Sequence, residues 1–402
     1  MANTGDLTIK NARLAESGEL VDISVFGGII GRIRPSGKTR ETTRETIDAG
    51  GNYISPGFID LHVHLRDPGF TYKEDIASGT KAAVKGGVTT LCCMPNTDPC
   101  IDSPEAVRYV PGQKAYCNVL PVGAITKSQK GEALTDFAAL KKAGAAALSD
   151  DGKPVESENL MREALIKAKE TGMLIMTHCE DLSLSGSESE DKITKRDTDL
   201  ARITGGRLHV CHVSTKKSAG YISAAKQSGC DITAETCPHY FTLTKEDAPK
   251  YGANAKMNPP LRSVEDREGI IEALKSKIID CISSDHAPHP DDEKEAGANG
   301  ITGLETLFAL SFTYLVKQNH ITLGELIRLL TYNPAKIIGI DKNRGTIEEG
   351  KAADLVIFDT DEKFTFDKNN SFSKSRNTPF HGFELYGRIL QTVVNGRVAY
   401  SG

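Results

Sequence analysis

The sequence predicts an α/β fold: a (β/α)8 TIM barrel joined to a small β-sandwich formed from both termini. Three observations indicate this. Apolar strand segments alternate with helical segments eight times through the middle of the 402-residue chain. Those strands are apolar on both faces, which is typical of a parallel sheet covered by helices. The two ends contain short strands and glycine-rich turns, which are typical of antiparallel pairing.

The sandwich is expected from residues 1–55 and 344–402, and the barrel from residues 56–343. In the first end, strand patterns lie at 7–10, 21–25 and 29–33. The last end has patterns at 353–359 and 389–400, and Asn395-Gly396 is a typical hairpin turn. The composite domain therefore unites segments that are far apart in the sequence.

The eight barrel strands are expected at 58–65, 89–94, 118–124, 145–149, 174–178, 207–213, 231–236 and 278–283. Helical periodicity separates most of them, as at 74–85, 158–171 and 219–228. Eight such units favour a closed barrel. An open doubly wound sheet would need a glycine-rich phosphate turn after an early strand, and the sequence has none there.

Composition and charge exclude several classes of function. The net charge of -5 gives no basic surface for nucleic acid, and no apolar run is long enough to span a bilayer. The start, Met1–Asp6, lacks the features of a signal peptide, so a cytoplasmic protein is expected. Nine scattered cysteines without a CxxC pair are expected to be reduced thiols.

His62 and His64 carry the most informative pattern. They lie two apart on an apolar strand, so both rings point to the same face. Buried imidazole nitrogens need partners, and a metal ion satisfies them well. The alternative is a pair of hydrogen-bonded core histidines.

Further polar residues end other strands: Asp151, His178, His212 and Asp285. The carboxyl ends of barrel strands meet at one mouth, so these side chains are expected to converge with the two histidines. Nitrogen and carboxylate ligands without thiolate suit catalytic Zn²⁺, with Mn²⁺ or Co²⁺ as substitutes. Six ligands exceed one tetrahedral shell, so two ions that share a bridging carboxylate are expected.

With these motifs the chain resembles the amidohydrolase superfamily, and within it the bacterial dihydroorotases. The resemblance covers nearly the whole chain and rests on the segments 62–69 (HVHLRDPG), 94–97 (MPNT), 150–152 (DDG), 178–181 (HCED), 212–215 (HVST), 257–262 (MNPPLR), 285–289 (DHAPH), 303–306 (GLET) and 377–380 (NTPF).

The resemblance implies two zinc ions per subunit, one held by His62, His64 and Asp285 and the other by His178 and His212. Asp151 would bridge them, where many relatives use a carboxylated lysine. Its neighbour Asp150 is expected to face away. Arg66 and Asn96 would grip a substrate carboxylate, and Asn258 and His289 would complete the pocket.

The implied reaction is the reversible cyclisation of N-carbamoyl-L-aspartate to (S)-dihydroorotate and water, in pyrimidine (UMP) biosynthesis. Asp285 would act as general base and then general acid.

One alternative is another cyclic amidohydrolase, an allantoinase or dihydropyrimidinase, which would normally carry the bridging lysine. A second is a non-catalytic partner of aspartate transcarbamoylase, but inactive relatives of that kind have lost metal ligands. A small-molecule substrate, a homodimer and possible association with aspartate transcarbamoylase are further expectations.

Several residues are expected to lie outside the metal centre. His209 should face the helices, His286 should make a supporting hydrogen bond, and His239 is a candidate for lining the pocket. The charge run 291–295 is expected to be a solvated loop edge. The segments 182–191 and 291–300 are shorter than in relatives, which bears on how the site closes over its substrate.

Overall fold

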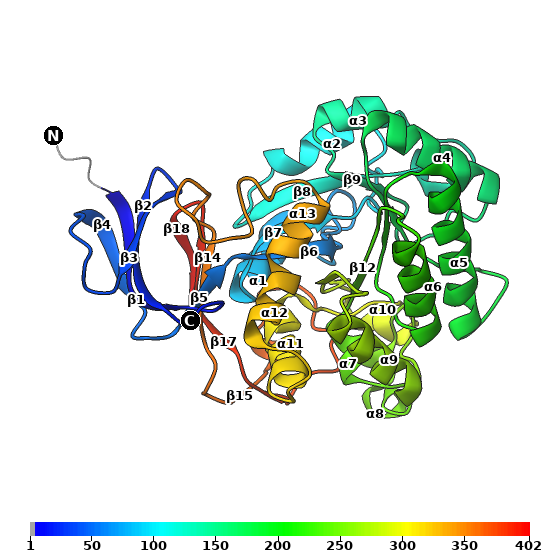
Figure 1. Ribbon diagram of the computed structural model, residues 1–402. Coiled ribbons are helices and arrows are strands. Elements are labelled where there is room, and N and C mark those ends of the chain that lie inside the picture. Colours follow the sequence, from blue (N-terminus) through cyan, green and yellow to red (C-terminus); the bar gives the residue numbers. More distant parts are fainter. Residues whose placement is uncertain (1–4) are drawn as a thin grey trace.

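Eight parallel strands form the centre of the larger part of the molecule, in a computed structural model that describes residues 5–402 (Figure 1). Their order in the sheet follows their order in the sequence. Each predicted barrel strand has an observed counterpart: β6 (Phe58–Val63), β7 (Val88–Cys93), β8 (Asn118–Gly123), β9 (Ala147–Ser149), β10 (Ile175–Thr177), β11 (Leu208–Val210), β12 (Ile232–Thr236) and β13 (Cys281–Ile282).

The first and last barrel strands meet just beyond their ends. Val63 pairs with His286 in a parallel bridge, and the backbone N–H of His64 donates to the carbonyl of His286 at 2.9 Å. The sheet therefore closes on itself where two predicted metal-binding segments lie side by side.

Helices surround the barrel: α1 (Ile76–Lys85), α2 (Pro104–Tyr109), α3 (Phe137–Ala143), α4 (Glu158–Thr171), α5 (Ser187–Thr204), α6 (Lys216–Gln227), α7 (Pro238–Thr242), α8 (Ala248–Tyr251), α9 (Val264–Lys275), α10 (Asp291–Glu295), α11 (Leu307–Ser311), α12 (Leu323–Leu330) and α13 (Tyr332–Ile337). The prediction for α4 has the observed bounds. α6 begins before its predicted start because the Thr215 side chain accepts from the N–H of Ser218 and caps the helix there.

Two apolar clusters lie on the two sides of the barrel wall. Ile59, Leu61 and Met176 belong to the inner cluster. Phe58 and Leu91 belong to a larger outer cluster that includes helical side chains. Burial on both sides explains why the strands are continuously apolar in the sequence.

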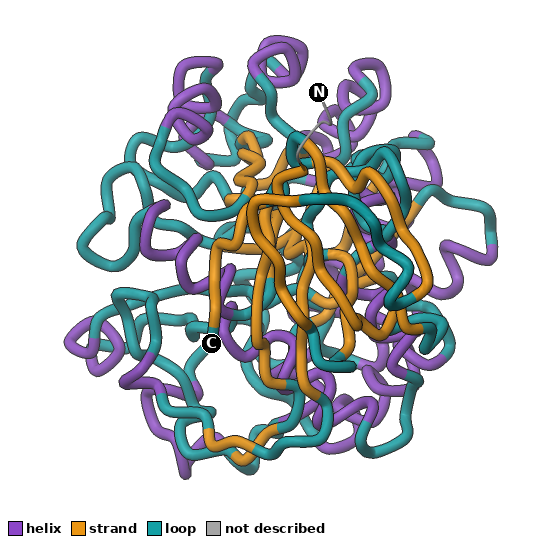
Figure 2. The backbone as a smooth tube through the Cα atoms, turned by 90° about the vertical axis from the view of Figure 1, so that its left-hand side faces the viewer, coloured by secondary structure: helices purple, strands orange, loops and turns teal. Residues whose placement is uncertain are grey.

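Both ends of the described chain contribute to one hydrogen-bonded sheet, which faces the viewer in Figure 2. Its strands are β1 (Gly5–Leu14), β2 (Leu20–Phe26), β3 (Ile29–Pro35), β4 (Thr43–Asp48), β5 (Tyr53–Pro56), β14 (Leu355–Asp359), β17 (Arg388–Val394) and β18 (Arg397–Ser401). A short pair, β15 (Phe364–Thr365) and β16 (Glu384–Leu385), stands apart. The predicted fold class is confirmed, with the terminal strands joined as a single sheet.

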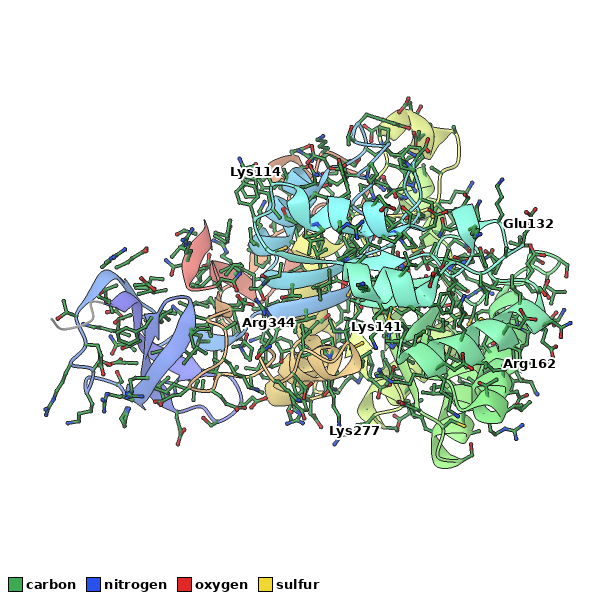
Figure 3. The ribbon with its side chains drawn as sticks, turned by 90° about the horizontal axis from the view of Figure 1, so that it is seen from above. Lys114, Glu132, Lys141, Arg162, Lys277 and Arg344 are labelled. Atoms are coloured by element: carbon green, nitrogen blue, oxygen red, sulfur yellow. The ribbon has the colours of Figure 1, made fainter. Side chains whose placement is uncertain are left out.

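Arg344 lies where the terminal sheet meets the barrel (Figure 3). Its guanidinium donates to Asp354 at 2.8 Å, to Asn118 of β8 at 3.2 Å and to Asn395 at 2.8 Å. This polar cluster, which ranges from buried Asp354 to exposed Asn395, links three distant segments of the chain. The exact division at residues 55 and 344 stays a prediction.

Part of the C-terminal segment, residues 371–380, contacts the barrel mouth rather than the terminal sheet. Ser373 donates to Glu74, and the side chain of Asn377 bonds the loop that follows β13. None of the helices in residues 5–402 has the length and apolar character needed to cross a membrane. Residues 1–4, part of the argument against a signal peptide, lie outside the described chain.

Candidate metal centre and substrate pocket

The six predicted metal ligands converge at the carboxyl ends of the barrel strands, and all six are buried. Asp151 lies at the centre. Its Oδ2 is 3.2 Å from Nε2 of His62 and 3.3 Å from Nε2 of His64. Its Oδ1 is 3.2 Å from Nδ1 of His178 and 3.1 Å from Nε2 of His212. The two oxygens of one carboxylate thus face two separate histidine pairs.

Asp285 completes one side of this centre. Its Oδ1 lies 3.4 Å from Nε2 of His64 and 3.7 Å from Nε2 of His62. Burial opposes ionisation of Asp285, but the nearby histidines, His64 first, hold its pKa below the usual value. The group is therefore a carboxylate at neutral pH.

Unusual backbone conformations aim three of the site residues. Arg66, His212 and Asp285 have φ angles of 59°, 35° and 47°, in the left-handed region that L-residues seldom adopt. Such strain persists only where the surroundings enforce it, and it is concentrated at functional sites.

Three of the four rings, those of His62, His64 and His178, also have a partner on the nitrogen that does not face Asp151. His62 Nδ1 lies 2.9 Å from Oε1 of Glu235, and His64 Nδ1 lies 2.8 Å from Oδ1 of Asn96. His178 Nε2 lies 3.1 Å from Oε2 of Glu180. These contacts fix which nitrogen of each of these three rings faces Asp151.

The donor set fits metal ions. Four imidazoles and two carboxylates suit Zn²⁺. Nε2 of His62 is fully buried and makes no hydrogen bond within residues 5–402, although Oδ2 of Asp151 lies 3.2 Å away. Burial opposes ionisation of Asp151, yet the surrounding histidines hold its pKa well below the usual value. A carboxylate flanked by imidazoles on both oxygens is a natural bridge between two cations.

The predicted substrate residues lie around this centre. Arg66 donates through Nε to the carbonyl of Pro288 at 3.3 Å, and its Nη2 lies 3.1 Å from Nε2 of His289. Burial lowers the pKa of Arg66 to about 10, so it is charged at neutral pH. Asn258 donates to Glu180 at 3.1 Å. Binding of substrate by Arg66, Asn96, Asn258 and His289 stays a prediction.

A cavity of about 150 Å³ opens beside the centre and is lined by His178, Glu180, Asn258 and Arg262, among others. One wall comes from the segment that precedes α5, including Leu184 and Gly186. The segment thus lies next to the reacting groups, as its place after a barrel strand predicts.

The structure corrects the prediction for His209, which lies inside the barrel rather than against the helices. Its Nδ1 is 2.8 Å from Oγ1 of Thr233, and its Nε2 is 3.3 Å from Oε2 of Glu235. The parity argument assumed a strand through Val213, but β11 ends at Val210 and the chain turns at His212.

The expectations for Asp150, His286 and His239 have different outcomes. Asp150 points away from the centre and accepts from the N–H groups of Ile125 and Thr126, as expected. His286 lies 3.4 Å from Glu74 and supports the fold rather than the centre. His239 is fully buried, and its Nε2 has no hydrogen-bond partner within residues 5–402.

The charge run 291–295 is not simply a solvated edge, and that expectation is wrong for two of its residues. Lys294 is buried and donates to the carbonyls of Lys256, Ala298 and Gly300 at 2.7, 2.7 and 2.8 Å. Glu293 contacts Nδ1 of His289 at 2.8 Å. A run of charged residues in a short segment does not reveal which side chains turn inward.

Two supporting carboxylates, Glu235 and Glu180, were not among the predicted residues. Glu235 is a charged residue within a strand that is otherwise apolar or neutral, which was the available signal. Glu180 lies two positions after His178, just beyond the end of β10, and no strand pattern in the sequence indicated its contact with that ring.

Comparison with known proteins agrees with this geometry. The profile of the Amidohydrolase family matches residues 53–399. A dihydroorotase of Acetivibrio thermocellus is 45% identical over 94% of each chain, and one of Ruminiclostridium cellulolyticum is 44% identical over 97% of each. The chain belongs to the amidohydrolase family, and within it to the dihydroorotases.

Among solved amidohydrolase-fold structures, the L-hydantoinase (dihydropyrimidinase) from Arthrobacter aurescens superposes with a TM-score of 0.92 at 27% identity, over 98% of this chain and 96% of that one. A D-hydantoinase from Thermus sp. gives a TM-score of 0.86, also at 27% identity, over 98% and 96%. The dihydroorotase relatives are much more similar in sequence, so they bear more specifically on the reaction.

Proposed function

We propose that this protein is a zinc-dependent dihydroorotase, which interconverts N-carbamoyl-L-aspartate with (S)-dihydroorotate and water in pyrimidine biosynthesis. The observation that carries the proposal is Asp151, whose two oxygens face His62 and His64 on one side and His178 and His212 on the other. The curated relatives with this name cover nearly the whole chain.

Two Zn²⁺ ions per subunit would be held by His62, His64 and Asp285 and by His178 and His212, with Asp151 between them. When bound, such ions lower the pKa of water and polarise a carbonyl oxygen. The buried donor set supports this assignment, as does Nε2 of His62, which makes no hydrogen bond within residues 5–402 although Oδ2 of Asp151 lies 3.2 Å away.

Asp285 is the proposed general base and acid. Its carboxylate is ionised at neutral pH, so it can take the proton of the attacking water. It then delivers that proton to the ring nitrogen that leaves the carbonyl carbon. In the synthetic direction the same group removes the proton from the carbamoyl nitrogen.

Arg66 is the proposed carboxylate clamp, since its planar guanidinium matches a carboxylate with two parallel hydrogen bonds. Asn96 and Asn258 would complete the contacts to the substrate. Asn96 also holds His64 and Asn258 also holds Glu180, so both would join substrate binding to the metal centre.

The decisive experiment measures metal content together with hydrolysis of dihydroorotate, allantoin and dihydrouracil. We expect zinc in the purified protein, turnover of dihydroorotate, and loss of both metal and turnover in Asp151→Ala. Turnover of allantoin or dihydrouracil without dihydroorotate would indicate the other cyclic amidohydrolases. Absence of both zinc and activity would favour a non-catalytic partner of aspartate transcarbamoylase.

The proposal extends to a cytoplasmic homodimer, with association to aspartate transcarbamoylase as a further possibility. The nine free cysteines agree with a reducing compartment. Light scattering of the purified protein, with and without the transcarbamoylase, tests both assemblies.

A further inference from the structure

We infer that Glu293 is a positioning residue, which fixes the tautomer of His289 and through that ring orients Arg66 toward the substrate carboxylate. The inference rests on the proposed function for the role of Arg66. Three contacts in a row carry it. Glu293 Oε2 lies 2.8 Å from His289 Nδ1, His289 Nε2 lies 3.1 Å from Arg66 Nη2, and Arg66 Nε donates to Pro288.

The chemistry of the two outer groups determines the state of the ring between them. A carboxylate only accepts hydrogen bonds, so Nδ1 of His289 must carry the proton. A guanidinium only donates, so Nε2 must present its lone pair to Arg66. Only the neutral ring protonated on Nδ1 satisfies both partners.

Burial and the adjacent Arg66 charge lower the pKa of His289 to about 4, in agreement with a neutral ring. An imidazolium would instead place an N–H against the donor of Arg66. The arrangement therefore has one favourable protonation state at neutral pH, and Glu293 selects the tautomer within it.

Glu293 is itself held in place from two sides. Lys73 Nζ lies 2.6 Å from its Oε2, and the hydroxyl of Tyr72 donates to its Oε1 at 2.7 Å. The next residue, Lys294, fixes the end of α10 through its three backbone carbonyl contacts. A half-buried carboxylate with three partners is far more constrained than a solvated one.

Arg66 gains a fixed orientation from this line of contacts. Its Nε and Nη2 are both engaged, which sets the plane of the guanidinium. Within residues 5–402 its Nη1 makes no hydrogen bond, so that edge is available to a ligand. Loss of the fixed plane should weaken substrate binding much more than it slows the chemical step.

The test compares Glu293→Ala with Glu293→Gln, whose amide oxygen can still accept from Nδ1 of His289. Glu295→Gln, at an exposed acid of the same helix, is the matched control for charge. We expect Glu293→Ala to raise KM for dihydroorotate about tenfold with kcat within about twofold. Glu293→Gln should stay within about threefold of wild type, and the control should not differ from it.

A double-mutant cycle tests whether Glu293 affects KM through the ring of His289. In a His289→Ala background, Glu293→Ala should have no further effect on KM, because the group through which it acts is gone. An added effect in that background would overturn the inference. So would an unchanged KM in the single Glu293→Ala variant.

A measurement without turnover separates this inference from the proposed function. The ¹⁵N spectrum of the histidine rings, with His289→Gln to assign the signal, should show His289 protonated on Nδ1. The share of that tautomer should fall in Glu293→Ala, where Arg66 alone favours it. A ring protonated on Nε2 in the wild type would overturn the inference. Inactivity toward dihydroorotate with the expected tautomer would overturn the proposed function instead.

Discussion

The carboxylate of Glu235 lies 2.9 Å from Nδ1 of His62, while Nε2 of the same ring lies 3.2 Å from Asp151. Glu235 also contacts Ser283 and Nε2 of His209, so its carboxylate has three polar partners. Burial opposes its ionisation, but His209 and His62 hold the pKa of Glu235 far below its usual value. A buried anion inside the barrel therefore sets the orientation of one proposed metal ligand.

Glu235→Gln is expected to weaken metal binding, because the amide keeps the hydrogen bond to His62 but removes the negative charge behind it. Loss of such an outer contact typically costs about 10- to 100-fold in metal affinity. Competition with a chromophoric chelator measures it. Glu163→Gln, at an exposed glutamate of α4, should bind metal as the wild type does; equal affinity in the Glu235 variant would contradict the prediction.

Asn377→Asp is expected to destabilise the loop that carries His289. The Asn377 amide donates to the carbonyls of Ala287 and Gly300 at 3.1 and 3.0 Å, and its oxygen accepts from the N–H of His289 at 3.1 Å. A carboxylate would face both carbonyls with no donor, at a cost of about 2–4 kcal/mol. Thermal unfolding and KM for dihydroorotate should both report the change.

Asn369→Asp provides the control for that experiment, since it makes the same chemical change at an exposed position of the C-terminal segment. It should leave both the melting temperature and KM unchanged. A similar loss of stability in both variants would mean that added charge, rather than the Asn377 contacts, is responsible.

Lys294→Met is expected to lower stability by about 2 kcal/mol, because three carbonyls would lose the ammonium donor and that of Ala298 would keep no other donor within residues 5–402. Methionine fills a similar volume, so packing changes little. Denaturant unfolding measures the loss, and Lys130→Met, at an exposed lysine, is the control. Equal stability of the two variants would show that the buried ammonium does not hold the loop.

The buried imidazole of His239 should make the free energy of unfolding depend on pH. Burial lowers its pKa to about 4 in the folded protein, against about 6.5 in the unfolded chain. Between these values the unfolded chain binds a proton that the folded protein does not. Stability should therefore fall as the pH falls from 6.5 to 4, by about 3 kcal/mol from this group.

His239→Gln removes this titration, so its unfolding free energy should depend less steeply on pH across the same range. Chemical denaturation at several pH values, with the metal content held constant, measures the slopes. Parallel curves for the variant and the wild type would contradict the assignment of the lowered pKa to His239.

The sequence predicted those parts of the fold that depend on local patterns. Apolar strands such as 118–124 alternate with helices such as 158–171, and eight repeats leave few alternatives to a barrel. The convergence of the six proposed metal ligands could be predicted because each lies at or just after the end of a strand, and barrel topology brings strand ends together. A short motif such as HVH therefore indicates a metal site only in a fold that places other polar strand ends beside it.

The residues that the sequence did not predict depend on contacts between distant segments. Asn377 makes hydrogen bonds to Ala287 and His289, about ninety positions earlier in the chain. No local sequence pattern predicts these contacts. Lys294 lies within a charged run and yet turns inward. His209 shows the limit of strand alternation, because a parity argument fails once the strand ends.

The contacts of Asn377 imply an order in which parts of the protein can fold during synthesis. A ribosome adds residues 371–380 only after the whole barrel has been synthesised, so a nascent barrel can bring its strand ends together before the His289 loop receives its last hydrogen bonds. Completion of the substrate pocket is in this way delayed until residues 371–380 have been synthesised.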